Sequence, residues 1–317
     1  MRRCRVMTAR RIWFAVVLSA CGGSQQPPPS AARAQAKPPP PPPSAPTQGL
    51  ATNAQLNGMF VNTGCGQMTG TPETVALFQK ACDAHDGQGC SELAGRYLCG
   101  KGVAQDYAKS TVLSEQGCDY GYIQSCNNVA MMVAYPQAKL DPSIAFKYAD
   151  KGCSAGDPAA CNGVGLMYLQ GIGTAADPVK AGRLFDDLCK KNNAMACANL
   201  AMQAYLGIGM PRDVKHAAEL ADSACKQGMP SACNTLGGIL IEEGGDDNMH
   251  RAEVLFTTIC DQADGNAACD NLGQLYAHGI TAKEPPNKDR AAAMFKKACD
   301  AGFAKSCTHL AELMSGQ

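Results

Sequence analysis

The sequence is organised around the stretch Cys153-Ser-Ala-Gly156-Asp157-Pro158-Ala-Ala-Cys161, an apolar run to Leu169, the loop Gly171-Ile-Gly173, and a second run from Asp177-Pro178 to Cys189. Each Asp-Pro pair is typical of a helix start, because the Asp side chain accepts free amide protons and Pro suits the first helical position. In the second run Ala181, Leu184, Phe185 and Leu188 have the i, i+3, i+4, i+7 spacing of one helix face. The stretch therefore predicts a helical hairpin.

The cysteines show that this hairpin is a repeat. They form local pairs whose first members recur at intervals of 36, 35, 36, 36, 35 and 39 residues, a period typical of a solenoid. Six pairs are spaced by eight residues and one by nine. The seven local pairs are Cys82 with Cys90, Cys118 with Cys126, Cys153 with Cys161, Cys189 with Cys197, Cys225 with Cys233, Cys260 with Cys269, and Cys299 with Cys307.

Disulfides are the expected state of these pairs. Each first Cys ends one helix and each second Cys lies in the opening turn of the next, so a tight reversal brings the two together. The alternative is zinc, but seven two-thiolate sites without converging histidines suit tetrahedral coordination poorly. For the remaining Cys65 and Cys99 we expect an eighth bridge between neighbouring loops, and the alternative is a free or intermolecular thiol. A left-handed cap is needed three residues after the first Cys, where the chain has Gly121, Gly156, Asn192, Gly228 and Gly302.

The N-terminus predicts export and lipidation. Residues 1–20 contain five Arg and no acidic residue, and the apolar run from Ile12 to Leu18 is too short to span a membrane. Leu18-Ser-Ala-Cys21-Gly22 resembles the bacterial lipobox. That resemblance implies cleavage before Cys21, acylation of Cys21, and an outer-membrane lipoprotein that is periplasmic or surface-exposed in the bacterial cell envelope. The alternative is an ordinary signal peptide cleaved elsewhere.

Residues 21–56 are expected to be the lipidated Cys and a proline-rich tether. Ten prolines lie between residues 22 and 56, six of them consecutive from Pro38 to Pro43, and such a segment favours polyproline II. After residue 20 the chain has 23 basic against 28 acidic side chains, which disfavours nucleic acid as a partner.

Residues 57–317 are predicted to form the repeat domain, an all-α, right-handed α-solenoid stapled by disulfides. A partial unit (about 50–66) and a helix from Thr71-Pro72 to Cys82 precede six hairpins, and a helix from about Ala304 to Met314 ends the array. A single hairpin cannot bury its apolar face, so stability should come from contacts between neighbours. The second helices are expected to start at Asp106, Asp141, Asp177, Asp213, Asp247 and near Asn287.

Leu93 to Asp106, Val164 to Asp177 and Leu200 to Asp213 each have a Leu/Val, Gly-x-Gly and Asp pattern that resembles the Sel1-type repeat. With its paired cysteines the chain is similar to the Helicobacter cysteine-rich protein family. In two units the loop departs from the pattern, at Tyr135-Pro136-Gln137-Ala138 and at Glu242-Glu243-Gly244-Gly245. The resemblance implies a TPR-like protein-binding scaffold, and also implies a weak penicillin-binding or β-lactamase-like activity as an alternative.

That alternative requires an active serine. Ser223-Ala-Cys225-Lys226 matches Ser-x-x-Lys, but the sequence has neither the Ser-Asp-Asn nor the Lys-Thr-Gly element that this mechanism needs. The match is best interpreted as chance. The histidines lie in different units without metal-ligand spacing, so we expect no metal site, no cofactor and no catalytic residue. They are His85, His216, His250, His278 and His309, and we expect them on the surface or in loops.

A ladder of polar residues just after the second cysteines is the candidate binding site. Asn side chains both donate and accept hydrogen bonds, which suits them to an extended peptide backbone on the concave surface that first helices line in Sel1-type arrays. The alternative is that they bridge neighbouring hairpins. The ladder consists of Asn127, Asn128, Asn162, Asn199, Asn234, Asp270 and Asn271.

The function predicted from these features is an envelope-anchored, non-catalytic scaffold that binds a protein or peptide. Cell-wall fragments are a further possible ligand, and the membrane is contacted through the lipid anchor alone. A third class is a structural spacer without a small ligand.

Overall fold

The structure is a computed structural model that describes residues 65, 68, 70–262, 265–281 and 283–315. Within these residues the chain forms fourteen α-helices and two short 3₁₀ helices, with one isolated β-bridge and no β-strand. The lipobox, the tether and nearly all of the predicted partial unit (about 50–66) lie outside the described residues. None of the described helices is long and apolar enough to cross a bilayer.

The helices alternate as six hairpins with one additional helix at each end. The first helices are Gly87–Cys99 (α3), Ile123–Met131 (α5), Pro158–Gln170 (α7), Ala194–Leu206 (α9), Pro230–Glu243 (α11) and Asn266–His278 (α13). The second helices are Tyr107–Asp119 (α4), Pro142–Ser154 (α6), Pro178–Cys189 (α8), Val214–Lys226 (α10), Asp246–Cys260 (α12) and Lys288–Asp300 (α14). Pro72–Asp83 (α2) precedes them and Ala304–Ser315 (α15) follows them.

Local sequence explains where the helices begin and end. The five residues predicted as caps three positions after a cysteine all have positive φ, and His85 does so as well. The predicted starts of the second helices are confirmed except at Asp247, because α12 begins at Asp246 after Gly245 and has no side-chain cap. His85 was not predicted as a cap, because only Gly and Asn were expected in this conformation. At six helix starts an aspartate side chain accepts a hydrogen bond from a backbone N–H of the first turn: Asp86, Asp106, Asp141, Asp157, Asp177 and Asp213.

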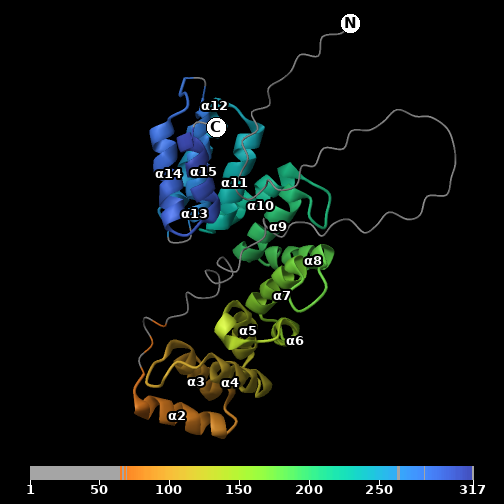
Figure 1. Ribbon diagram of the computed structural model, residues 1–317. Coiled ribbons are helices and arrows are strands. Elements are labelled where there is room, and N and C mark those ends of the chain that lie inside the picture. Colours follow the sequence, from red (N-terminus) through yellow and green to blue (C-terminus); the bar gives the residue numbers. More distant parts are fainter. Residues whose placement is uncertain (1–64, 66–67, 69, 263–264, 282, 316–317) are drawn as a thin grey trace, which may run out of the picture.

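The hairpins stack into the predicted α-solenoid, which runs from α2 at one end to α14 and α15 at the other (Figure 1). Consecutive helices pack against each other. At three junctions, α3 with α5, α5 with α7 and α9 with α11, the first helices contact each other more extensively than the matching second helices do. The array therefore curves around the first helices, which line its inner side. The core is accordingly divided into small clusters of buried residues along the chain, as expected for a quasi-one-dimensional fold.

Glycines permit close contacts both between and within repeats. A Cβ on Gly173 would lie 2.0 Å from the carbonyl oxygen of Pro142, and one on Gly209 2.6 Å from that of Pro178. The second glycine of the Gly-x-Gly loop thus packs directly on the helix start of the preceding repeat. Within a repeat, a Cβ on Gly165 would lie 2.5 Å from the ring of a phenylalanine in the second helix.

The two departures from the loop pattern do change the structure. Between α5 and α6, two 3₁₀ helices replace the usual loop, at Met132–Ala134 (η2) and Pro136–Ala138 (η3), and Lys139 takes the left-handed conformation that glycine provides elsewhere. Between α11 and α12, Gly244 has φ 72° and ψ −174°, outside the left-handed helical region that Gly171 and Gly207 adopt in the regular loops. The expectation that these loops differ in shape is confirmed.

Candidate functional site

All sixteen cysteines in the described residues form disulfides. Each local pair joins the end of a second helix, or of α2, to the first helix that follows it, with Cα–Cα distances from 4.3 to 4.8 Å. The expected eighth bridge, between Cys65 and Cys99, is present with a Cα–Cα distance of 5.5 Å. The local bridges join Cys82 with Cys90, Cys118 with Cys126, Cys153 with Cys161, Cys189 with Cys197, Cys225 with Cys233, Cys260 with Cys269, and Cys299 with Cys307.

These bridges, which we call staples, hold each repeat on its neighbour. They fix how successive first helices face each other, because every second cysteine lies near the start of a first helix. Five of the seven second cysteines are buried, whereas Cys161 and Cys307 are only partly buried. The buried ones are Cys90, Cys126, Cys197, Cys233 and Cys269. Each staple closes a short loop, which by the chain-entropy model contributes about 2.5 kcal/mol to stability.

The polar ladder forms hydrogen bonds between successive first helices. We use the word rung for a bond from the residue two positions after a second cysteine to the residue one position after the second cysteine of the preceding repeat. Asn199 Nδ2 donates to Asn162 Oδ1 at 2.9 Å, and Asn271 Nδ2 donates to Asn234 Oδ1 at 2.9 Å. Asn128 Nδ2 donates in the same way to Ser91 Oγ at 3.2 Å.

Most of the ladder is buried, which corrects its assignment as a peptide-binding surface. The reason is that the staples bring first helices together, so residues beside the second cysteine face the neighbouring helix rather than solvent. The structure thus favours the alternative interpretation, in which these side chains bridge hairpins. Asn162, Asn234, Asp270 and Asn271 are all less than 10% exposed, and Asn127, Asn128 and Asn199 are only partly exposed.

Two junctions have no rung because one partner is too small. Between α5 and α7 the donor position is Gly163, and between α9 and α11 the acceptor position is Ala198. Of the first-helix pairs, these two make the most extensive contacts. Small residues let the helix axes approach, whereas an asparagine pair fills the space between them.

At the C-terminal end the rung is charged. Asp270 is fully buried, and its Oδ1 accepts hydrogen bonds from Ser306 Oγ and from His309 Nδ1, the latter at 2.8 Å. Gln274 Nε2 donates to Oδ2 at 2.8 Å. This carboxylate holds α15 against α13. His309 was expected on the surface or in a loop, but it lies in α15 and is partly buried against Asp270.

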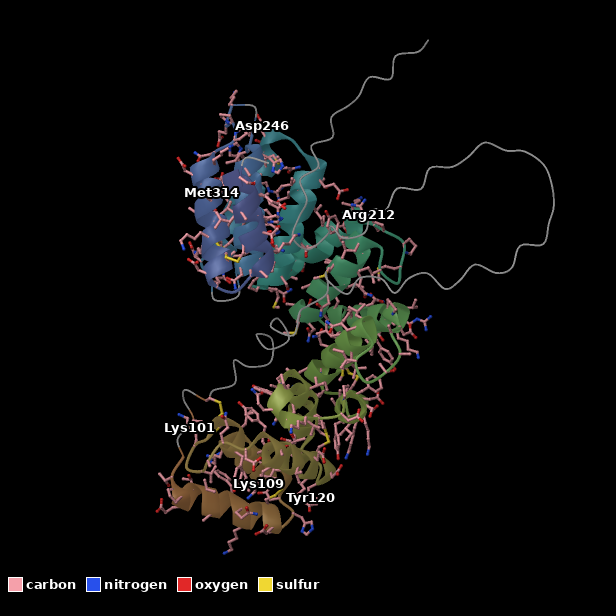
Figure 2. All side chains as sticks on the ribbon, in the orientation of Figure 1. Lys101, Lys109, Tyr120, Arg212, Asp246 and Met314 are labelled. Carbon is pink, nitrogen blue, oxygen red and sulfur yellow. A yellow bond between two sulfur atoms is a disulfide. The ribbon has the colours of Figure 1, made fainter. Side chains whose placement is uncertain are left out.

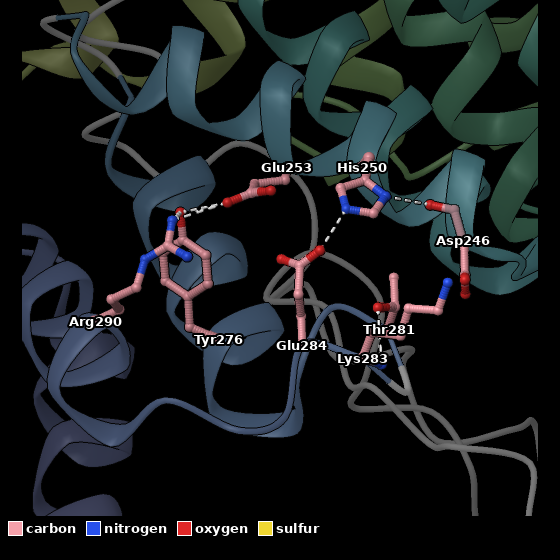
Figure 3. A network of polar contacts seen from close by, with 8 residues as sticks. All are labelled: Asp246, His250, Glu253, Tyr276, Thr281, Lys283, Glu284 and Arg290. Atoms are coloured by element: carbon pink, nitrogen blue, oxygen red, sulfur yellow. Dashed lines mark hydrogen bonds and ion pairs between the residues drawn. The ribbon is translucent and has the colours of Figure 1, made fainter.

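Two tyrosine–glutamate–arginine clusters join neighbouring elements of the array. Tyr276 donates to Glu253 Oε1 at 2.9 Å, and Arg290 lies over the tyrosine ring at 3.7 Å from its centroid and also pairs with Glu253 (Figure 3). In the second cluster, Tyr205 on α9 and Arg212 in the loop after it both bind Glu242 on the next first helix, α11. Burial and the neighbouring Glu242 raise the pKa of Tyr205, so its hydroxyl stays a donor at neutral pH.

One histidine contact is sensitive to pH. His250 Nδ1 lies 2.7 Å from the carbonyl oxygen of Asp246, and Nε2 lies 2.7 Å from Glu284 Oε1 (Figure 3). Both ring nitrogens face acceptors, so the arrangement favours the imidazolium form. The hydrogen bond to Glu284 raises the pKa of His250 above its ordinary value.

The Ser-x-x-Lys match lies on the second helix α10. Ser223 is exposed there, and the Lys226 ammonium pairs with Asp222 at 2.6 Å rather than with the serine. Figure 2 shows the side chains of the described array. Among the described residues, no group of three His, Cys, Asp or Glu side chains is placed to hold a metal ion.

Two hollows of the described array lie beside first helices. The larger is an open groove of about 250 Å³ between α12 and α14, floored by α13 and lined by Thr257, Cys260, Asp261, Leu272, Tyr276, Arg290, Ala293 and Met294. The smaller, which we call the notch, is a cavity of about 20 Å³ between α5 and α7. Its lining is Asn127, Ala130, Val133, Ala134, Gly163, Leu166, Met167 and Ile172.

Comparison with known proteins identifies the repeat. The family model described as Sel1 repeat matches residues 87–119, 123–157, 158–193, 194–229 and 266–303. A Sel1 repeat protein from Oxalobacter formigenes has a similar structure, with a TM-score of 0.58 and 26% identity, covering 74% of this chain and 68% of that one. The Helicobacter pylori cysteine rich protein B covers 39% of this chain and 94% of its own at 22% identity, with a TM-score of 0.33.

A curated relative matches part of the array. The Drosophila melanogaster protein named cytochrome c oxidase assembly factor 7 homolog is 33% identical over 82 residues. The match spans 24% of this chain and only 30% of that relative's length.

Proposed function

Because the chain belongs to the Sel1 repeat family, we propose that it is a non-catalytic scaffold that binds a protein or an extended peptide on its inner side. The observation that carries the proposal is the row of first helices from α3 to α13, which the disulfides hold in a fixed arrangement. A preformed surface of this kind binds without the entropic cost of ordering itself.

The proposal includes an anchor in the bacterial envelope. The eight disulfides support an oxidising compartment, because such bonds are rare in the cytosol. Cys4 and Cys21 are the two cysteines that precede the described residues, and Cys21 follows the Leu18-Ser-Ala sequence of the lipobox. Lipidation of Cys21 and the proline-rich tether would display the scaffold from the outer membrane.

Site-specific photo-crosslinking in cells tests the scaffold. A photoreactive residue at Met202, a half-buried position on the first helix α9, should form a crosslink to an envelope protein or peptide. The matched control is Val179 on the second helix α8, which is 48% exposed and should not form the same product. An equal yield of that product from Val179 would contradict binding on the inner side.

Membrane fractionation tests the anchor separately. Cys21→Ser should move the protein from the membrane fraction to the soluble fraction while its melting temperature stays the same, because the tether separates Cys21 from the folded repeats. Retention of Cys21→Ser in the membrane fraction would refute lipid anchoring and leave the scaffold proposal intact.

A further inference from the structure

The two hollows differ in whether their polar groups still need a partner. In the larger groove, Arg290 pairs with Glu253 and Asp261 pairs with Lys297, so the charged groups of its lining are engaged. In the notch, Asn127 Oδ1 is buried without a hydrogen-bond partner. The Nδ2 of the same side chain reaches only the sulfur of a methionine on its own helix, at 3.7 Å. A buried acceptor without a donor is uncommon in folded proteins.

The ladder shows which kind of group is missing. At the same repeat position as Asn127, Asn162 Oδ1 receives an amide N–H from Asn199, and Asn234 Oδ1 receives one from Asn271. For Asn127 the corresponding donor position is Gly163, which has no side chain. A Cβ built on Gly163 would have no atom within 4 Å, so the space that a donor would occupy is open.

The other side chains that line the notch indicate which kind of molecule could supply the missing hydrogen-bond donor. Apart from Asn127, every side chain that lines the notch is aliphatic or a thioether. A water molecule needs two to four polar partners to be held in a cavity. An occupant with one N–H donor and a small apolar body fits this lining better. The cavity of about 20 Å³ is small, so it suits a methyl group better than a larger side chain.

We propose that the notch between α5 and α7 is the anchor subsite for an alanine-sized residue of an extended peptide, whose backbone N–H donates to Asn127 Oδ1. The subsite rests on the proposed function, because it assigns a ligand chemistry to the same inner side. It also explains why this junction lacks a rung. The ligand N–H takes the place of the side-chain amide that Gly163 does not have.

An NMR titration of the full chain with three small probes tests the subsite. N-acetyl-alanine-methylamide should shift the side-chain amide of Asn127 and the backbone amide of Gly163, with an affinity in the millimolar range expected for about ten heavy atoms. The leucine analogue should not, because its side chain is too large. The alanine analogue methylated on its own nitrogen should bind about fivefold more weakly, since it lacks the donor.

Two variants supply the matched comparison. Gly163→Asn places an amide at the donor position, so it should fill the notch and abolish the alanine-probe shifts while the melting temperature holds or rises. Ala159→Asn introduces the same side chain at an exposed position of the same helix and should leave the titration unchanged. If Gly163→Asn does not fold, Asn127→Ala tests the same subsite. Loss of the acceptor should weaken binding of the alanine probe about fivefold.

A peptide library displayed on phage distinguishes failure of the subsite from failure of the scaffold. Selected peptides that bind the wild-type chain should bind Gly163→Asn several-fold more weakly. Peptides that bind both equally, or alanine-probe binding that is unchanged by methylation, would overturn the subsite and leave the scaffold proposal standing. If no peptide is selected and no probe shifts the notch, both proposals fail.

Discussion

The junctions between α5 and α7 and between α7 and α9 are built from the same repeat, yet their inner sides differ. Between α7 and α9, Asn199 and Asn162 form a rung in which Asn162 is only 2% exposed. Between α5 and α7, Gly163 leaves Asn127 Oδ1 without a partner and the helices approach more closely. The donor position of the rung is therefore an asparagine that bonds the repeats between α7 and α9, and a glycine that makes no such bond between α5 and α7.

The staples do not account for this difference, because both junctions have one. Cys153–Cys161 and Cys189–Cys197 have Cα–Cα distances of 4.3 and 4.7 Å. The two junctions therefore differ in the amide pair and in how closely the first helices pack. They form a matched pair in which the contribution of a rung can be measured against a common disulfide.

The largest effect should come from removing the staples. Cys153→Ser with Cys161→Ser, and Cys189→Ser with Cys197→Ser, should each lower the free energy of unfolding by about 2.5 kcal/mol. Denaturant unfolding of the first variant should show two transitions, because no rung bridges that junction and the array uncouples there. The second variant should retain one transition at a lower midpoint.

The wild-type chain under the same oxidising conditions is the control for both variants. Two unfolding transitions in the Cys189→Ser, Cys197→Ser variant and one in the Cys153→Ser, Cys161→Ser variant would contradict the prediction. That result would mean that the closer helix packing between α5 and α7 couples the repeats more strongly than the rung does.

Single substitutions isolate the amide pair from the staple. Asn162→Ala should lower the free energy of unfolding by about 1–3 kcal/mol, because it removes a buried rung and leaves Asn199 without its acceptor. Asn127→Ala should change it by less than about 0.5 kcal/mol, because it removes an acceptor that already has no donor. Chemical denaturation of both variants checks this. Equal losses would show that Asn127 has a bonded partner in solution.

The smallest effect on the free energy of unfolding should come from pH. It arises at His250 on α12 and does not involve either junction. The pKa of His250 is raised by Glu284 and the Asp246 carbonyl, so its stabilisation is fully present below its ordinary pKa of 6.5 and is lost as pH rises through the raised value. Glu253, on the next turn of α12, acts in the same direction. The stability difference between wild type and His250→Gln should thus shrink above pH 6.5. A difference that grows with pH would contradict the contact.

The fold was largely predictable because local rules and the cysteine period agree. The Asp-Pro helix starts, the caps after the cysteines and the repeat length each act within a few residues, and all pointed to the same hairpin. The cysteine pairs identified the junctions, since a bridge across eight residues has few possible geometries.

The role of the ladder was less predictable because it depends on register across some 37 residues. Asn162 and Asn199 stand at different positions after their cysteines, and that offset is what lets one donate to the other. The offset was itself a usable signal, because it recurs between Asn128 and Ser91 and in the rung between α11 and α13. The notch was not foreseeable, since it follows from how closely α5 and α7 approach each other.

A double-mutant cycle on Asn162 and Asn199 decides whether the ladder joins repeats rather than binding a ligand. Asn162→Ala, Asn199→Ala and the double variant should give a coupling of about 1 kcal/mol in the free energy of unfolding, with the double variant less destabilised than the sum of the two single variants. We expect this coupling in the absence of any ligand. Additive losses within experimental error would show that the two side chains do not bond to each other, and would refute the rung as the link between repeats.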